Sequence, residues 1–297
     1  MNRRRFLQVF GLGALAAALM GTYAVAIEPL VRLRITRYAL TPPRWTPGLR
    51  LRVAVLTDLH ACEPWTPRGR IERIVAETNA LQPDAVLLLG DYVSGMRLAA
   101  RHLEPREWAG ILAGLRAPLG RFAVLGNHDW WEDAGVQARG HGPTEAGEAL
   151  NAVGIPVLEN RAVPLEKDGH RFWVAGLGDQ LAFTPTSLRR RWEGTDDLPG
   201  TLAQVTDDAP VLLMAHEPDI FPEMPERVSL TLSGHTHGGQ VRLFGYSPVV
   251  PSRYGNRYAY GHVVEEGRHL VVSAGLGCSI APIRFGSPPE IVVLDLG

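Results

Sequence analysis

Residues 51–60 read LRVAVLTDLH, a mainly apolar run that ends in Asp58 and His60. An apolar, strand-like run followed by a residue that can bind a metal is how an α/β protein presents ligands at the carboxyl ends of its strands. Four further polar clusters follow apolar runs in the same way: Gly90-Asp91, Gly126-Asn127-His128-Asp129, His216 and Gly234-His235-Thr236-His237. The repeated arrangement predicts loops that converge on one site.

The residue types in these clusters indicate a pair of metal ions. Two divalent ions about 3.5–4 Å apart need a bridging carboxylate, several imidazoles and an open side for water and substrate. Mixed nitrogen and oxygen ligands suit Mn, Fe, Zn, Co or Ni, whereas Ca and Mg prefer oxygen ligands. In Asp58-x-His60 and His235-x-His237 the paired residues are two apart. That spacing puts both side chains on one face of a strand, and in a strand-end loop it lets both approach the metals.

The series D-x-H, G-D, G-N-H-D, H and G-H-T-H resembles the calcineurin-like metallophosphoesterase superfamily, from about Leu51 to the C-terminus. Residues 234–240 (GHTHGGQ), 275–277 (GLG) and 282–285 (PIRF) are similar to the exported bacterial YkuE-type branch. The resemblance implies an α/β fold for a catalytic domain over residues 51–297. This fold is a four-layer αββα sandwich of two mixed β-sheets flanked by helices. The order of elements agrees, because strands alternate with helices in the first half and strands dominate the second.

The resemblance also implies a role for each residue of the series. The implied ligands are Asp58, His60 and His237 for the first ion, Asn127, His216 and His235 for the second, and Asp91 as the bridge between them. The ions would be Mn, Zn or Fe. His128 would not bind metal but would stabilise the transition state or protonate the leaving oxygen, and Asp129 would orient it. A metal-bridging hydroxide would then attack the phosphorus of a phosphoester in line with the leaving group.

Single members of the series have ordinary explanations as well. Asp58 alone could cap a helix or stand in a turn, and His216 alone could be a hydrogen-bonded structural histidine. The ordered set is what favours a metal site. The remaining histidines lie outside the motifs and are interpreted as surface or structural residues: His102, His141, His170, His262 and His269.

The periodicity of apolar residues predicts the main elements. Helices are expected at residues 68–81, 105–115 and 144–153, the last capped by Thr144. Between residues 157 and 177 we expect two strands joined by a hairpin turn at Lys167-Asp168-Gly169. Further strands are expected at residues 52–56, 85–89, 122–125, 211–215, 230–233, 270–273 and 291–296.

The N-terminus resembles a twin-arginine export signal, with NRRRFLQ at residues 2–8. Phe6–Ile27 carries no charge and is long enough to span a bilayer, and Ala24-Val25-Ala26 offers a small-x-small cleavage site. Residues 1–27 are therefore either a removed signal peptide or an uncleaved anchor. The basic flank puts the N-terminus in the cytoplasm, and the twin-arginine machinery would deliver the domain to the periplasm or cell envelope.

Residues 28–50 form a basic, membrane-proximal segment, which could lie against anionic headgroups. Val31, Leu33 and Ile35 alternate with polar residues, which favours an edge strand, and the two interpretations are compatible. Without residues 1–26 and their three arginines, the net charge of −1 becomes −4. This balance does not indicate a nucleic-acid-binding surface.

The sequence is less informative about the substrate and the thiols. Arg253, Arg257 and Arg284 could clamp a phosphate, and the pair Trp130-Trp131 could stack on a base or line an acyl groove. Equally, these side chains could simply pack a surface loop. The two cysteines, Cys62 and Cys278, could form a disulfide after export, but free thiols are the default expectation.

The function expected is a binuclear-metal-dependent phosphoesterase, above all a phosphodiesterase, acting at the membrane on a phosphoester that could be lipid-linked. One alternative is a UDP-2,3-diacylglucosamine-type pyrophosphatase in lipid A synthesis. Export counts against it, because such precursors are cytoplasmic. The other is a metal-binding envelope protein without turnover. The presence of His128 counts against that, because a purely binding site has no use for a histidine that is not a ligand.

Overall fold

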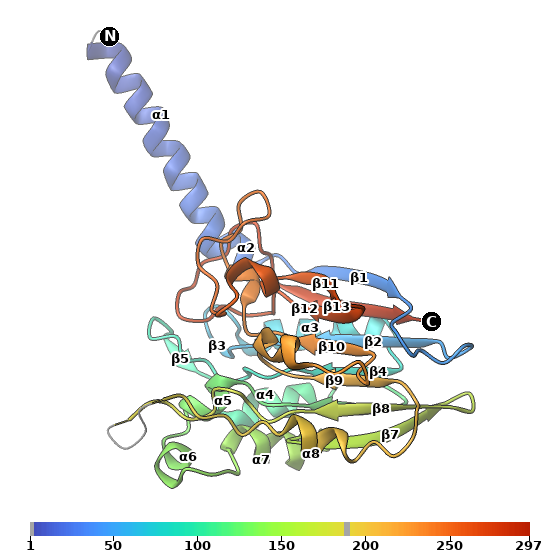
Figure 1. Cartoon of the computed structure of the whole chain (residues 1–297). Coiled ribbons are helices and arrows are strands. Elements are labelled where there is room, and N and C mark those ends of the chain that lie inside the picture. The colour runs from blue at the N-terminus through green and yellow to red at the C-terminus, as the bar shows by residue number, and fades with distance from the viewer. Residues whose placement is uncertain (1–2, 187–190) are drawn as a thin grey trace.

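A computed structural model describes residues 3–186 and 191–297 of the chain. In this described part, β-strands form two mixed sheets and a small two-stranded ribbon (Figure 1). The first sheet has five strands in the order β1 (Arg34–Leu40), β13 (Glu290–Leu296), β2 (Leu51–Leu56), β4 (Ala85–Leu88) and β6 (Arg121–Ala123). Strands β2, β4 and β6 are parallel, so their carboxyl ends lie at one edge of the sheet.

The second sheet has six strands among the described residues. Their order is β11 (Gly261–Glu265), β12 (Arg268–Val272), β10 (Leu230–Ser233), β9 (Val211–Met214), β8 (His170–Gly176) and β7 (Arg161–Lys167). Here β8, β9, β10 and β12 run parallel. The ribbon pairs β3 (Cys62–Glu63) with β5 (Arg101–His102).

The two sheets pack face to face, and strand β2 shows why. Its side chains alternate, so Val53 and Val55 pack between the sheets while Ala54 and Leu56 pack under helices. The helices on that outer face are α3 (Arg68–Ala80), α4 (Pro105–Leu112) and α7 (Glu145–Ala152). The second sheet is covered outside by α8 (Leu198–Leu202), η2 (Pro218–Glu223) and η4 (Gly255–Tyr258). The predicted four-layer sandwich is confirmed.

The expected elements lie close to the observed ones. Helices α3, α4 and α7 begin within one residue of their predicted starts, and Thr144 caps α7 by accepting a hydrogen bond from the Gly147 N–H at 3.0 Å. Strands β7 and β8 form the expected hairpin, with Asp168 and Gly169 in the turn. Strand β1 lies at the edge of the first sheet. An edge strand was expected here from the alternation of Val31, Leu33 and Ile35 with polar residues, and the strand begins at Arg34.

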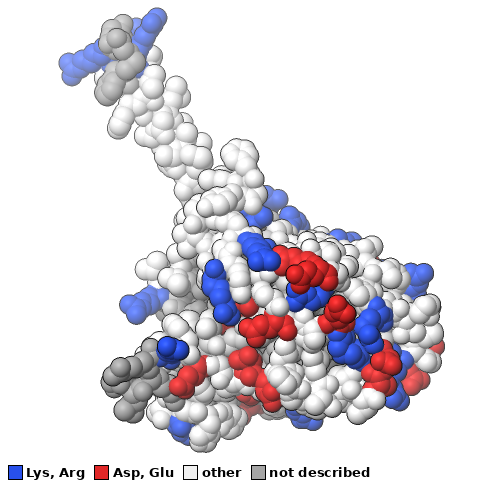
Figure 2. Space-filling view, in the orientation of Figure 1, with Lys and Arg blue, Asp and Glu red and all other residues white. Residues whose placement is uncertain are grey.

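The N-terminal segment projects away from the domain as a rod (Figure 1). It consists of α1 (Arg3–Thr22), a π-helical turn η1 (Tyr23–Ile27) and α2 (Glu28–Leu30). Figure 2 shows α1 uncharged along its length, with basic residues only at its tip. This helix is long and apolar enough to cross a bilayer, a property that anchors and signal sequences share.

Candidate metal centre

The predicted ligand residues all lie in the segments that follow strands. Asp58 and His60 follow β2, Asp91 follows β4, Asn127 opens the short helix α5 (Asn127–Trp131) after β6, His216 follows β9, and His235 and His237 follow β10. The parallel strands bring these loops to one edge of each sheet. The packed sheets bring the two edges together, so residues far apart in the chain converge.

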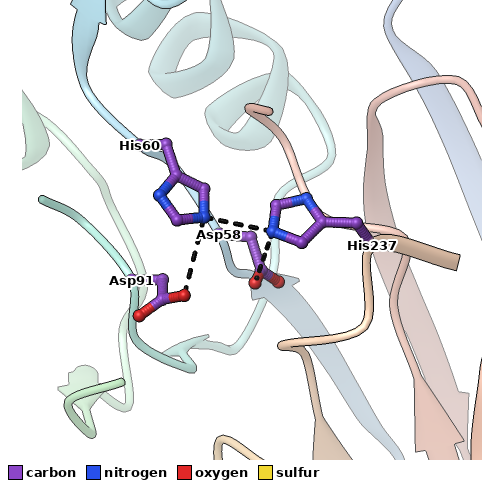
Figure 3. A group of neighbouring side chains, drawn as sticks. All are labelled: Asp58, His60, Asp91 and His237. Carbon is purple, nitrogen blue, oxygen red and sulfur yellow. Dashed lines mark hydrogen bonds and ion pairs between the residues drawn. The ribbon is translucent and has the colours of Figure 1, made fainter. Parts of the chain in front are cut away.

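These side chains form two groups of possible metal ligands that share one carboxylate. In the first group are Asp58, His60, Asp91 and His237, all buried (Figure 3). In the second are Asp91, His216 and His235. Within each group the donor atoms lie within 4.8 Å of one another. Asp91 belongs to both groups, which is the arrangement that a bridging ligand requires.

The first group is compact around the ring of His60. Its Nε2 lies 3.1 Å from Nε2 of His237 and 3.5 Å from Oδ2 of Asp91. The Nε2 of His237 is in turn 3.3 Å from Oδ1 of Asp58. Figure 3 shows these four side chains pointing toward one another from three loops. Two imidazole nitrogens and two carboxylates thus face a common point.

The second group lies on the other side of Asp91. The Nε2 of His216 is 3.2 Å from Oδ2 of Asp91. The Nδ1 of His235 lies 2.8 Å from the side-chain oxygen of Asn127, so this amide oxygen joins the same group of donors. All seven residues predicted as ligands are therefore brought together.

The donor set fits divalent ions on two further grounds. His60 and His216 each direct Nδ1 to a backbone carbonyl, of Val93 at 3.1 Å and of Leu89 at 2.6 Å. An Nδ1–H that donates to a carbonyl leaves Nε2 with its lone pair facing the centre of the cluster, as in ligating histidines. The same bonds also fix the orientation of each ring.

The electrostatics of the first group also fit bound cations. Burial lowers the pKa of His60 to about 3, so its imidazole is neutral and able to bind a metal near pH 7. Burial, with a contribution from the charge of Asp91, raises the pKa of Asp58 to about 6. Two carboxylates held together away from water repel each other, and bound cations would remove that repulsion.

Strained backbone supports a functional reading of these loops. Five of the predicted ligands have left-handed backbone conformations, with φ between 44° and 66°: Asp58, His60, Asp91, His235 and His237. This conformation costs a non-glycine residue on the order of 1–2 kcal/mol. Its concentration in one cluster indicates that the loops are shaped for the side chains they present.

His128 lies beside the cluster, and its ring has partners that the sequence interpretation missed. Its Nδ1 is 3.3 Å from a carboxylate oxygen of Glu132, and its Nε2 is 3.3 Å from the hydroxyl of Ser279. Burial disfavours the charged ring, but Asp91 and Glu132 outweigh burial and raise the pKa of His128. Glu132 stands four residues after His128 on consecutive helical turns, a spacing that could have revealed it.

Asp129, which was predicted to orient the ring of His128, binds backbone groups in the structure. Its carboxylate instead accepts backbone hydrogen bonds from Asp91, Tyr92 and Val93, at 2.9–3.0 Å, and from Gly126 at 2.9 Å. Because Asp129 lies one residue after His128 at the start of a helix, its side chain leaves in another direction. It fixes the loop that carries Asp91.

The three arginines that the sequence offered as possible phosphate ligands have other partners in the structure. The side chain of Arg284 is fully buried and donates to the carbonyls of Ala274, Gly277 and Ser287, with its Nη2 3.1 Å from Nδ1 of His237. Arg257 is bound to Glu265 at 2.7 and 2.8 Å. Arg253 lies 3.5 Å from Asp219. Arg284 therefore holds the loop of residues 274–287 against His237. Arg253 and Arg257 lie in ion pairs.

Cys62 and Cys278 are free thiols and both are buried. Burial raises the pKa of each thiol. Cys62 follows the loop that carries His60, and neither cysteine belongs to the two groups of donors described above.

Comparison with known proteins agrees with this geometry. The model of the calcineurin-like phosphoesterase family matches residues 51–239, which span every residue of the two donor groups. The chain belongs to this family. It is 29% identical over 303 residues to the uncharacterized metallophosphoesterase YkuE of Bacillus subtilis, covering 100% of this chain and 98% of that protein.

Two other relatives extend the comparison. The chain is 31% identical over 306 residues to the phosphodiesterase YaeI of Escherichia coli, covering 100% of this chain and 99% of that protein. It is also 31% identical over 257 residues to a transmembrane protein with metallophosphoesterase domain of Danio rerio, covering 83% of this chain and 53% of that protein. The YkuE-type branch of the superfamily is thereby confirmed, and the chain is a phosphoester hydrolase by family.

Proposed function

We propose that this protein is a phosphodiesterase that uses two divalent ions, bound by the seven clustered residues. The observation that carries the proposal is the pair of donor groups joined by Asp91, with His128 beside them. The name of the Escherichia coli relative, a phosphodiesterase, supports the choice of diester over monoester. When bound, the ions would activate a water molecule and offset the charge that develops on the phosphoryl oxygens.

The chain's own residues would position the substrate and move a proton. The backbone N–H of His128 donates to Oδ1 of Asp91 at 2.8 Å, which ties the histidine to the bridging carboxylate. The Nε2 of His128 faces Ser279 at the open side of the cluster, whereas its Nδ1 is held by Glu132. A protonated ring held in this way can donate a proton to the leaving oxygen of a phosphodiester.

The test is hydrolysis of bis(4-nitrophenyl) phosphate compared with 4-nitrophenyl phosphate by the purified full chain. We expect diester cleavage with Mn²⁺ or Zn²⁺ and none with chelator. In Asp91→Asn both activity and metal content should fall. In His128→Ala activity should fall by about 100-fold or more while the metal content is kept, and His141→Ala, an exposed histidine outside the cluster, is the matched control.

Two outcomes would contradict the proposal. A full complement of two ions with no cleavage of either ester would refute the phosphodiesterase function. Loss of metal in His128→Ala would show that this residue is a ligand, and its role as proton donor would then be wrong.

For the location, we infer that helix α1 is a permanent anchor that keeps the domain at the outer face of the inner membrane. The domain binds the end of this helix firmly. The Arg284 N–H donates to the Ala24 carbonyl at 2.8 Å, and the Glu28 carboxylate accepts from the N–H groups of Gly286 and Ser287 at 3.1 and 2.7 Å. Cleavage after Ala26 would separate Ala24 from this contact.

Fractionation tests this location. The full-length chain should remain in the membrane pellet after alkaline extraction, with its C-terminal domain accessible to protease from the periplasm. Replacing both Arg4 and Arg5 by Lys should leave the domain protected on the cytoplasmic side, if export uses the twin-arginine route. A mature protein that begins at Ile27 would refute the anchor.

A further inference from the structure

A cavity of about 630 Å³ opens at the candidate metal centre, and its surfaces differ sharply in character. The polar end is formed by Asp91, Asn127, His128, His235 and His237. The walls beyond it are apolar and include Trp131, Val241, Pro248, Val249, Ile280 and Ile283. Among the described residues that line the cavity there is no lysine or arginine. A soluble, highly charged phosphate compound would find few partners outside the metal centre.

The apolar walls continue onto the surface of the domain. Ile280 and Val249, at the mouth of the cavity, are 81% and 75% exposed. Phe244, at the turn of the loop between β10 and β11, is wholly exposed, and Tyr246 beside it is 62% exposed. Large apolar side chains gathered on two loops in this way are costly in water and typical of a surface that meets a membrane or a ligand.

One of these loops, which carries Ile280 and precedes β13, contacts η1, the turn that follows helix α1. Figure 1 shows the orange and red loops that follow β10 and precede β13 around the domain end of this helix. Phe285 packs edge-on against Tyr23, with ring centroids 5.9 Å apart, and Arg284 binds Ala24 through its backbone. Ile283, which lines the cavity, directly precedes Arg284. The cavity mouth is therefore tied to the helix within a few residues.

The length of the helix relates the cavity to the membrane. A 20-residue helix such as α1 rises about 30 Å, which is the thickness of the hydrocarbon core of a bilayer. Its basic tip, Arg3 to Arg5, marks one interface, and the point where Ala24 becomes buried marks the other. The loops that follow β10 and precede β13 lie at this second end of the helix (Figure 1).

We propose that the substrate is a membrane-embedded phosphodiester lipid whose acyl chain occupies the apolar part of the cavity and whose phosphate reaches the metal centre. This inference rests on the phosphodiesterase function proposed above. It adds that Val249 and Ile280 bind the chain, and that the substrate enters from the bilayer. The contacts of Tyr23 with Phe285 and of Ala24 with Arg284 hold the cavity mouth at the height of the headgroups.

The experiment compares two esters with the same leaving group, methyl 4-nitrophenyl phosphate and hexadecyl 4-nitrophenyl phosphate. The full-length chain is reconstituted in phosphatidylcholine vesicles. In both reactions the oxygen of water bonds to phosphorus, the bond from phosphorus to the aryl oxygen breaks, and 4-nitrophenolate leaves. The readout is the ratio of kcat/KM for the hexadecyl ester to kcat/KM for the methyl ester.

Variants distinguish binding of the hexadecyl chain in the cavity from simple partitioning of this ester into the vesicles. Ile280→Glu and Val249→Glu each place a carboxylate on the apolar wall, and each should lower the ratio by about tenfold or more. Val264→Glu is the matched control, because Val264 is 52% exposed on strand β11 and does not line the cavity. Partitioning of the hexadecyl ester into the vesicles is the same for every variant. A difference between variants in the ratio of the two kcat/KM values therefore reports on the cavity.

The outcomes distinguish the two proposals. If the unmodified chain cleaves neither ester although it has bound its ions, the phosphodiesterase function is refuted. If it cleaves both and all three variants keep the same ratio, the lipid-binding cavity is refuted and the phosphodiesterase function stands. Both wall residues are largely exposed, so their substitution should leave the fold intact, which the metal content verifies.

Discussion

The carboxylate of Asp129 holds the backbone of Asp91, with Oδ2 accepting a hydrogen bond of 2.9 Å from the Asp91 N–H. Asp91 is the carboxylate shared by both groups of metal ligands, and its backbone is in the left-handed conformation, with φ of 56°. Such a conformation persists only when the surrounding structure holds it. Asp129, from the neighbouring loop, supplies that support.

Asp129→Asn should therefore disrupt the metal centre although Asp129 is not a ligand. The amide nitrogen of Asn would face backbone N–H groups and leave buried donors unpaired, at a cost of about 2–3 kcal/mol. We expect a lower free energy of unfolding in urea and a reduced metal content by elemental analysis. Glu148→Gln, at an exposed site on α7, is the control. An unchanged metal content would show that the loop does not depend on Asp129.

Glu132→Gln tests whether this carboxylate positions His128. The substitution removes the charge 3.3 Å from the His128 ring but leaves the shape of the side chain. We expect kcat to fall about tenfold, with KM and metal content little changed. Residues that hold an active-site side chain in position typically contribute a factor of about 10–100 to activity. An equal loss in kcat and in bound metal would instead indicate a structural role.

Removal of the ions should destabilise the domain. The buried carboxylates of Asp58 and Asp91 would then repel each other without compensation. At an ion concentration about 100 times Kd, binding stabilises the folded state by about 2.7 kcal/mol. For a domain of this size, we expect chelation to lower Tm by about 5 °C or more, and Mn²⁺ or Zn²⁺ to restore it. Asp91→Asn should show no such response, and equal Tm values with and without chelator would contradict the metal site.

The thiols of Cys62 and Cys278 should be unreactive in the folded protein. Both are buried, with thiol pKa values raised by burial, so few thiolates are available at neutral pH. We expect Ellman's reagent to react with neither in the native chain and with both after unfolding in guanidinium chloride. Unfolded protein that lacks reactive thiols would show that the pair is oxidised to a disulfide.

Much of the fold could be predicted from local patterns. The apolar run of residues 51–56 is typical of a strand buried on both faces, and the 3.6-residue spacing in α3 is typical of a helix buried on one. The ligand residues could be found because each directly follows such a run. These are properties of short segments, so the sequence displays them without any knowledge of packing.

The partners of the site residues were harder to predict. Asp129 stands next to His128 in the chain, and the family resemblance implied that it would orient the ring. The helix that begins at Asn127 turns the two side chains apart, so Asp129 meets the backbone of residues 91–93 and Glu132 meets His128. For Arg284 the sequence left a phosphate ligand and a packing residue equally open, and the structure shows it buried by the packing of residues 274–287.

The sequence by itself determined the family, the order of strands and helices, and the residues gathered at the candidate metal centre. These follow from residue type and spacing, which are local. Only the tertiary structure decided that Asp91 is shared between two groups of ligands and that an apolar cavity leads from the centre toward helix α1. Such relations arise when segments more than 100 residues apart pack against one another, as Asp58 and His235 do at 3.0 Å. No pattern within a single segment records that approach.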